Sequence, residues 1–384
     1  MFTVYIHTIF AMMKFITTSI GPKMSNLSYL LSKNNFDKSD IIQLLSLTEK
    51  DDIEQLYKQA YKIKTENVGN KVYFRGIIEF SNICAKDCYY CGIRKSNQSV
   101  DRFIMEKQEI INSAIWAYEA GYGSIVLQSG EREDNQFADF VEELLLEIKE
   151  KTDNKLGITL SLGEQTEETY KRWFNAGGHR YLLRIETSNK SLYQSLHPEN
   201  HGHEKRIECI NSLKRLGYQT GTGVMIGLPN QTIEDLANDI LFFEENDIDM
   251  IGMGPFIPHH DTPLSNSLGE FNDYKEGQLE LALKMIAVAR IYLKDVNIAS
   301  TTALQALDHS GREMGLQAGA NIIMPNVTDT KYREKYQLYD NKPCMDENST
   351  MCKACLGNRV KSVGETIGYN EWGDSPHYKK RHNE

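Results

Sequence analysis

The hydrophobic positions of the chain follow two alternating patterns between residues 71 and 326. Short apolar runs predict strands, and between them apolar residues recur every three or four positions, which predicts amphipathic helices. The eight predicted strands are 72–80, 124–128, 157–162, 181–185, 221–226, 249–254, 296–301 and 320–324. Eight strands that alternate with helices over about 250 residues favour a complete (β/α)8 barrel of the TIM type, and an open parallel sheet is the alternative.

The predicted barrel has further segments on both sides. One apolar stripe follows Asp40, and a second follows Thr48, which forms a capping-box-like pair with Asp51; both predict short N-terminal helices. The expected parts are an N-terminal extension, these helices, the barrel and a cysteine-containing tail, at 1–23, 24–70, 71–330 and 331–384.

The first 16 residues are apolar but too few to span a bilayer. They also lack the basic start and the cleavage site of a signal peptide. We therefore expect residues 1–23 to be a start-site artefact or a disordered extension, with Met24 as an alternative start. A segment that lies on a membrane surface is the alternative.

Composition narrows the class of protein. Of the 384 residues, 40% are hydrophobic and 25% are charged, which is typical of globular chains and excludes disordered and fibrous classes. The net charge of −10, without a basic block, makes nucleic acid an unfavourable partner. No stretch is suited to crossing a membrane, so we expect a cytoplasmic protein without membrane or nucleic-acid partners.

Six of the seven cysteines fall into two triplets, which indicates metal binding in a reducing compartment. Cys84, Cys88 and Cys91 follow the first strand with the spacing C-x3-C-x2-C. Three thiolates on a short loop can hold three irons of a 4Fe–4S cube and leave the fourth iron open. A structural zinc site needs four closed ligands, and no fourth Cys or His lies nearby in the sequence. This spacing is the radical SAM signature.

Polar residues follow several other strands, at the end of a barrel where catalytic residues gather. Glu164 could accept ribose hydroxyls, and Arg184 could bind a carboxylate in a fork, although each could equally form a salt bridge at the rim. Met225 could line an adenosyl group or belong to the core. Thr301 and Thr302 could hydrogen-bond a carboxylate substrate.

The sixth strand is followed by His259, His260 and Asp261, which resemble metal ligands. Because neighbouring histidines on an extended chain point apart, we expect a positioning loop rather than a metal site.

These segments together resemble the radical SAM maturases of FeFe-hydrogenase, in the biotin synthase-like branch of the superfamily. The resemblance covers roughly residues 27–375. It rests on motifs in chain order: YFRGIIEFSNICAKDCYYCGIR (73–94), IVLQSGE (125–131), TLSLGE (159–164), RYLLRIETSN (180–189), GTGVMIGLPNQT (221–232), DMIGMGPFIPHHDTPL (249–264), ANIIMPN (320–326) and YQLYDNKPC (336–344).

The resemblance implies a complete barrel with a buried lumen and a 4Fe–4S cluster that reductively cleaves S-adenosylmethionine (SAM). The resulting 5′-deoxyadenosyl radical would act on a small cysteine-derived or Fe–cysteine–CO–CN substrate during assembly of the hydrogenase 2Fe subcluster. The implied partners are the maturation proteins HydF and HydG and a low-potential electron donor.

The same resemblance assigns roles to single residues. Cys84, Cys88 and Cys91 would hold the catalytic cluster, and Thr301 and Thr302 would face the substrate. The implied SAM contacts are Gln128, Glu164, Arg184, Met225 and Tyr336.

The second triplet lies in the tail, where Cys344, Cys352 and Cys355 have the spacing C-x7-C-x2-C. Such a set can hold an auxiliary 2Fe–2S or 4Fe–4S cluster, as in some members of the family that the chain resembles. A zinc site or idle thiols are the alternative. We expect this site to lie outside the lumen.

Three other interpretations compete. Biotin synthase donates sulfur from a second cluster inside its barrel, but here no predicted strand from 124 to 324 carries a cysteine. A methylornithine synthase-like mutase would also suit a carboxylate-binding lumen, but it lacks the tail triplet. A non-catalytic iron–sulfur scaffold would not need SAM-type residues at successive strand ends.

Overall fold

The computed structural model of the chain describes residues 26–268 and 277–382. The expected extension at 1–23 lies outside these residues. The chain divides into an N-terminal unit that ends at Asn34 and a main unit from Asn35 onward. Within the described part of the first unit there is one helix, α1 (Asn26–Leu31). No helix among the described residues is long and apolar enough to cross a membrane.

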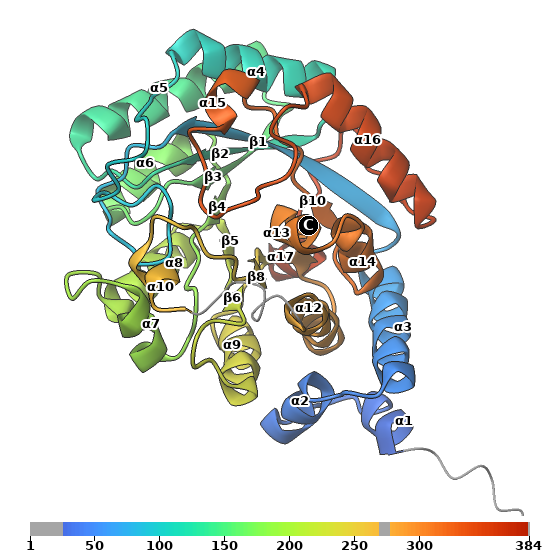
Figure 1. Cartoon of the computed structure of the whole chain (residues 1–384). Coiled ribbons are helices and arrows are strands. Elements are labelled where there is room, and N and C mark those ends of the chain that lie inside the picture. Colours follow the sequence, from blue (N-terminus) through green and yellow to red (C-terminus); the bar gives the residue numbers. More distant parts are fainter. Residues whose placement is uncertain (1–25, 269–276, 383–384) are drawn as a thin grey trace, which may run out of the picture. The chain divides into compact units, whose positions relative to one another are not determined.

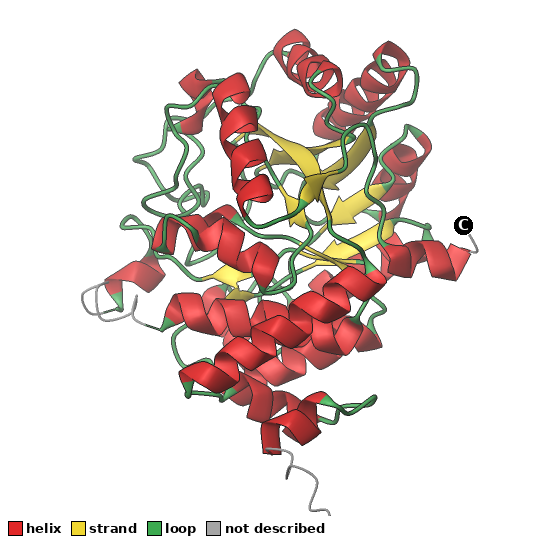
Figure 2. Ribbon diagram, turned by 90° about the vertical axis from the view of Figure 1, so that its right-hand side faces the viewer, coloured by secondary structure: helices red, strands yellow, loops and turns green. Residues whose placement is uncertain are grey.

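The main unit is built on a parallel sheet of eight strands. They are β1 (Lys71–Ser81), β2 (Ser124–Ser129), β3 (Gly157–Ser161), β4 (Arg180–Leu182), β5 (Gln219–Thr222), β7 (Met250–Ile251), β9 (Asn297–Ile298) and β10 (Ile322–Ile323). Their order is β10-β1-β2-β3-β4-β5-β7-β9, and a parallel bridge between Ala299 and Ile322 joins its two ends. The predicted α/β fold of the TIM-barrel type is therefore confirmed (Figures 1 and 2).

Several predicted strands are shorter in the structure, among them 181–185, 296–301 and 320–324, and two others are divided where the chain bends. The stretch 221–226 is divided between β5 and β6 (Met225–Ile226), and 249–254 between β7 and β8 (Gly254–Pro255). A Cβ atom on Gly223 would lie 2.1 Å from the carbonyl oxygen of Gly252, so only glycine allows this close approach. Beyond the bend, β6 and β8 pair with each other.

Helices follow most of the strands and cover the outside of the barrel. They are α4 (Lys107–Glu119), α5 (Asn135–Lys151), α6 (Glu167–Asn175), α7 (Lys190–Leu196), α8 (His203–Arg215), α9 (Ile233–Glu245), α10 (Pro263–Asn266), α12 (Gln278–Leu293), α13 (Thr302–Leu307) and α14 (Gly311–Gln317). The apolar stripe of α5 is buried, as its periodicity predicts. Figure 1 shows α4, α5 and α6 outside β1 to β4.

The helices before the barrel are α2 (Lys38–Leu45) and α3 (Lys50–Asn67). The expected capping box at Thr48 and Asp51 is wrong, because α3 has Glu49 at its N-cap and makes no side-chain capping bond. A capping box forms instead at α2: Asp37 accepts from the Asp40 amide at 2.9 Å, and the Asp40 side chain accepts from the Asp37 amide at 3.1 Å.

The tail (331–382) packs against the barrel as part of the main unit. Its elements are α15 (Thr330–Arg333), α16 (Ser349–Ser362), β11 (Thr366–Ile367) and α17 (Pro376–His382). β11 pairs in parallel with the start of β1. The following segment crosses the amino ends of the strands, where the Gly373 carbonyl accepts hydrogen bonds from Arg75 (3.1 Å) and Asn297 (2.9 Å). The tail thus covers the end of the barrel opposite the predicted site.

Candidate active site

The first cysteine triplet lies on the loop after β1, and two polar side chains fix this loop. Asn82 donates to the carbonyls of Asp101 (2.8 Å) and Lys335 (2.7 Å) and accepts from the Phe103 amide at 2.8 Å. Arg102 donates to four loop carbonyls, those of Asn82, Ile93, Arg94 and Asn97. Sequence reasoning missed both residues, since a lone Asn or Arg carries no local signal.

Cys84, Cys88 and Cys91 are free and half-buried, and their thiols lie close enough to shift one another's pKa. Burial raises the pKa of Cys88 to about 12, and the Cys84 sulfur adds to the rise. Burial also raises the pKa of Cys91 strongly, with further contributions from the other two thiols. Such thiols stay protonated at neutral pH unless a metal takes the place of the protons, so the set fits an iron–sulfur cluster.

Gln128 and Tyr336 meet beside this triplet. The side-chain amide of Gln128, at the end of β2, donates to the Tyr336 hydroxyl at 3.2 Å. Burial raises the pKa of Tyr336 well above its ordinary value, and Glu79, Cys91 and Cys84 lie close enough to contribute. Two predicted SAM contacts from distant parts of the chain are thus brought together.

Glu164 lies nearby but is already paired. Its carboxylate contacts Arg206 Nε at 2.6 Å and Lys86 Nζ at 3.0 Å, and Lys86 also contacts Glu131 at 3.0 Å. Burial alone would raise the pKa of Glu164, but Arg206 and Lys86 outweigh it and lower the pKa. Burial dominates for Glu131, whose pKa is raised. Lys86, within the cysteine loop, and Arg206, on α8, were not predicted.

Arg184 and Glu186 follow β4 and carry unused hydrogen-bonding capacity. Arg184 Nη2 lies 2.9 Å from Glu186 Oε2. Among the described residues, however, neither these atoms nor Arg184 Nε have a partner in hydrogen-bond geometry, although all three are buried. Glu186 also has a left-handed backbone, with φ of 65°. Unmatched buried groups on a strained backbone at a strand end fit a polar ligand such as an amino-acid carboxylate or amine.

Met225 is buried in an apolar cluster of five residues: Leu192, Leu196, Met225, Leu228 and Phe256. Tyr90, which lies between Cys88 and Cys91, packs against this cluster. The cluster gives the triplet an apolar neighbour from β6.

The two predicted substrate residues lie at the start of α13. Thr301 Oγ1 is buried and has no hydrogen-bond partner among the described residues. Thr302 Oγ1 accepts from Arg312 Nη2 at 3.0 Å. The buried Arg312 guanidinium keeps Nε and Nη1 unmatched within the described part of the chain. Arg312 was not predicted, and it adds a positive charge to this end of the site.

The second triplet gathers in the tail around Cys344. The Cys344 thiol lies near both Cys355 and Cys352, and burial raises the pKa of Cys344 and Cys352. Arg312 and Arg359 face Cys344, and Arg312 and Arg333 face Cys352. Three arginines around three thiols suit an anionic metal–thiolate group.

The expectation that His259 and His260 point apart is wrong. Their rings stack with centroids 4.6 Å apart and an angle of 16°. Asp340 from the tail fixes the orientation of the His260 ring. The Asp340 carboxylate lies 2.8 Å from His260 Nδ1 and also accepts from the His260 amide at 2.9 Å. His259 Nδ1 accepts from the Asp261 amide at 3.2 Å. His260 thus lies between two carboxylates, those of Asp340 and, at 3.4 Å, Asp261.

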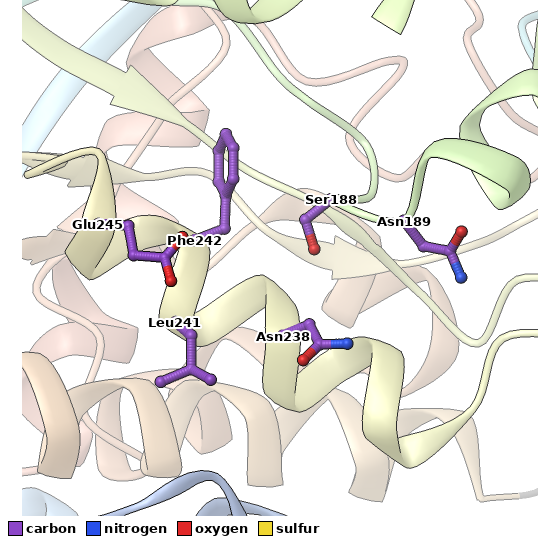
Figure 3. A pocket seen from close by; sticks show the side chains of 6 residues that line it. All are labelled: Ser188, Asn189, Asn238, Leu241, Phe242 and Glu245. Atoms are coloured by element: carbon purple, nitrogen blue, oxygen red, sulfur yellow. The ribbon is translucent and has the colours of Figure 1, made fainter.

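A separate hollow of about 340 Å³ lies between α9 and the segment before α7 (Figure 3). Its lining residues are Ser188, Asn189, Asn238, Leu241, Phe242 and Glu245. None of them belongs to the site described above, so we assign this hollow no part in it.

The chain is similar in sequence to known proteins. The model of the Radical SAM superfamily matches residues 78–243. The chain is 44% identical over 345 residues to the FeFe-hydrogenase maturase subunit HydE of Thermotoga maritima, which covers 89% of this chain and 95% of that protein. It is 27% identical over 330 residues to 3-methylornithine synthase of Methanosarcina acetivorans, which covers 85% and 88% of the two chains.

Solved structures agree on the fold. Methylornithine synthase (PylB) has a TM-score of 0.76 at 24% identity and covers 90% of this chain and 98% of its own. The FeFe-hydrogenase maturase HydG from Carboxydothermus hydrogenoformans has a TM-score of 0.75 at 20% identity, with 89% and 78% covered. The chain therefore belongs to the radical SAM superfamily and, within it, to the family of the FeFe-hydrogenase maturase subunit HydE.

Proposed function

We propose that the chain is a radical SAM enzyme of FeFe-hydrogenase maturation whose 4Fe–4S cluster is held by Cys84, Cys88 and Cys91. The observation that carries this proposal is the set of three half-buried cysteines on a fixed loop, beside the unmatched groups of Arg184 and Glu186. When bound, the reduced cluster supplies the electron that cleaves SAM to methionine and a 5′-deoxyadenosyl radical. The chain's own residues position SAM and keep water from the site.

The predicted SAM contacts differ in what they can offer. Arg184 has two unmatched N–H groups and suits the methionine carboxylate. Gln128 and Tyr336 present a paired amide and hydroxyl, and Met225 an apolar surface beside Tyr90. Glu164 is ion-paired with Lys86 and Arg206. It can therefore offer SAM a fixed negative charge and only those oxygen lone pairs that the two cations leave free.

For the substrate we propose a small cysteine-derived or Fe–cysteine–CO–CN species. A cysteine carboxylate is the chemical feature that the site can recognise, through Thr301, Thr302 and the free N–H groups of Arg312. The proposed partners are HydG as the source of this species, HydF as the acceptor of the product, and a low-potential electron donor.

We also propose that Cys344, Cys352 and Cys355 hold a second 2Fe–2S or 4Fe–4S cluster. The arginines around these thiols support it, since they offset the charge of an anionic cluster. Replacing Cys352 with Ala should lower the iron content by two to four atoms per chain if the second cluster is real, as expected for these cluster types. Unchanged iron content would contradict it.

The central test is formation of 5′-deoxyadenosine. The full chain is reconstituted anaerobically with iron and sulfide, reduced with dithionite and given SAM, and the products are separated by liquid chromatography. We expect product from the wild type and none from Cys88→Ala. The matched control is Cys209→Ala, because Cys209 is a buried thiol on α8 whose contact is the Gln165 carbonyl at 3.8 Å.

Absence of product from a fully loaded wild type would favour a scaffold that only holds a cluster. Adding the iron–cysteine product of HydG distinguishes the cases: cleavage that starts only then indicates an enzyme that waits for its substrate. Likeness to 3-methylornithine synthase makes a lysine mutase the second candidate. Conversion of lysine by the loaded enzyme would support the mutase and contradict the maturase proposal.

A further inference from the structure

The segment 197–203 carries three histidines that the proposed function does not use. It joins α7 to α8, and His197, His201 and His203 are all buried. The segment is anchored to the cysteine loop, where the Tyr89 amide donates to the Leu196 carbonyl at 2.9 Å. Three imidazoles thus lie on the side of the loop where Cys88 is found.

The tautomer of His197 follows from its partners. Its Nδ1 lies 2.8 Å from the Tyr193 carbonyl, which can only accept, so Nδ1 carries a proton. Burial lowers the pKa of His197 to about 3, so the ring is neutral and Nε2 is an acceptor. The Tyr90 hydroxyl lies 3.4 Å from Nε2 and also hydrogen-bonds the Cys88 sulfur.

His201 is a second side-chain neighbour of the Cys88 sulfur, in addition to Tyr90. Its Nδ1 lies 4.0 Å from Cys88 Sγ, a long contact that is still within reach for a large sulfur acceptor. Among the described residues, the His201 ring has no other hydrogen-bond partner. The His203 ring packs edge-on against the Tyr193 ring, with the two centroids 5.1 Å apart.

We propose that His201 donates a hydrogen bond to the Cys88 thiolate and thereby raises the reduction potential of the cluster that the first triplet holds. Reduction adds negative charge to the cluster and its thiolates, and a donor beside the sulfur stabilises that charge. His201 is a positioning residue that acts through Cys88. The inference rests on the proposed cluster at Cys84, Cys88 and Cys91.

The test is the midpoint potential of the cluster in the full chain without SAM, followed by electron paramagnetic resonance during a reductive titration. All variants carry Cys344→Ala, Cys352→Ala and Cys355→Ala, so that the signal comes from one cluster. His201→Phe should shift the potential to more negative values, and His201→Gln, which keeps an N–H donor, should restore part of the shift. His203→Phe is the matched control, since it replaces an equally buried ring in the same segment, and its potential should equal that of the parent.

Equal potentials for the parent and for iron-loaded His201→Phe would overturn the proposal. An equal shift in His203→Phe would also overturn it, because the effect would then come from repacking of the segment. If His201→Phe does not load iron, the smaller His201→Leu takes its place in the comparison. A parent chain that takes up no cluster would instead refute the proposed function, so the two failures are distinguishable by iron and sulfide content.

Discussion

The side-chain amide of Gln128 donates a hydrogen bond of 3.2 Å to the hydroxyl of Tyr336, 208 positions later in the chain. This bond ties the end of β2 to the tail beside the first cysteine triplet. Two residues expected to contact SAM therefore hold each other in place, and each depends on the other for its orientation.

Tyr336→Phe should weaken SAM binding while the iron content stays unchanged. The substitution removes the acceptor of the half-buried Gln128 amide, which costs about 1 kcal/mol, or roughly fivefold in affinity if the loss is realised in binding. SAM affinity is measured from the change in the electron paramagnetic resonance spectrum of the reduced cluster. The control is Tyr332→Phe, whose hydroxyl bonds Glu109 instead. Equal affinities in the wild type and Tyr336→Phe would show that this pair does not shape the SAM site.

The barrel and the cysteine loop could be predicted because their signals are local. An apolar run followed by a helical stripe identifies a βα unit from its own residues, and C-x3-C-x2-C lies within eight positions. The exact strand ends could not be predicted, since the bend at Gly223 depends on contact with Gly252 in another strand.

The partners of the site residues could not be predicted for the same reason. Glu164 meets Arg206, 42 positions away, and His260 meets Asp340, 80 positions away. Such pairs depend on how whole elements pack, and no spacing in the sequence encodes them. The stacked rings of His259 and His260 are the clearest case, because the rule for neighbouring side chains failed once the tail supplied a carboxylate.

Lys86→Met should destabilise the chain, because Lys86 bridges two buried carboxylates. Its ammonium lies 3.0 Å from both Glu131 and Glu164. Breaking a buried ion pair costs several kcal/mol, and partial exposure together with the remaining Arg206 reduces the expected loss to roughly 2 kcal/mol. Urea unfolding of the apoprotein at pH 7 measures it. Lys58→Met is the control, because Lys58 pairs with Glu54 on the surface of α3, and it should change stability by about 0.5 kcal/mol or less.

Lys86→Met should also change how the free energy of unfolding falls as the pH is lowered. The folded pKa of Glu164 is lowered, so its contribution is present above the unfolded value of 4.5 and is lost as the pH falls through the folded pKa. Removing Lys86 raises the folded pKa, so less stability should be lost in acid, and the loss should be complete at a higher pH than in the wild type. An unchanged pH dependence of the free energy of unfolding in acid would contradict the pairing of Lys86 with Glu164.

His260 should titrate above the ordinary histidine value of 6.5, and Asp340→Asn should bring its pKa back down. The hydrogen bond to Asp340 raises the pKa of His260. Because the folded pKa is the higher one, the contact between the loop after β8 and the tail is strongest below pH 6.5 and weakens as the pH rises through the folded pKa. Nuclear magnetic resonance of histidine-labelled apoprotein measures the titration. Asp346→Asn, in an exposed part of the same tail, should leave it unchanged.

Asp374→Asn should destabilise the contact between the tail and the end of the barrel that the tail covers. Asp374 Oδ1 accepts from Arg180 at 2.5 and 3.0 Å and from Gln219 at 2.9 Å, and Arg180 is fully buried. The variant keeps the shape of the side chain but leaves the guanidinium without its counter-charge, which should cost about 3 kcal/mol in urea unfolding of the apoprotein at pH 7. Asp153→Asn is the control, because Asp153 is exposed and pairs with Lys155 on the surface, so it should change little.

The pH dependence of this difference identifies the ion pair as its cause. Burial alone would raise the pKa of Asp374, but Arg180 and His179 outweigh it and lower the pKa well below 3.8. The stabilisation is then complete above pH 3.8 and is lost as the pH falls toward the folded pKa, so the wild type should approach the Asp374→Asn variant in acid. A difference that stays constant from pH 7 down to acid unfolding would mean that the variant acts through packing of the tail and not through the charge on Asp374.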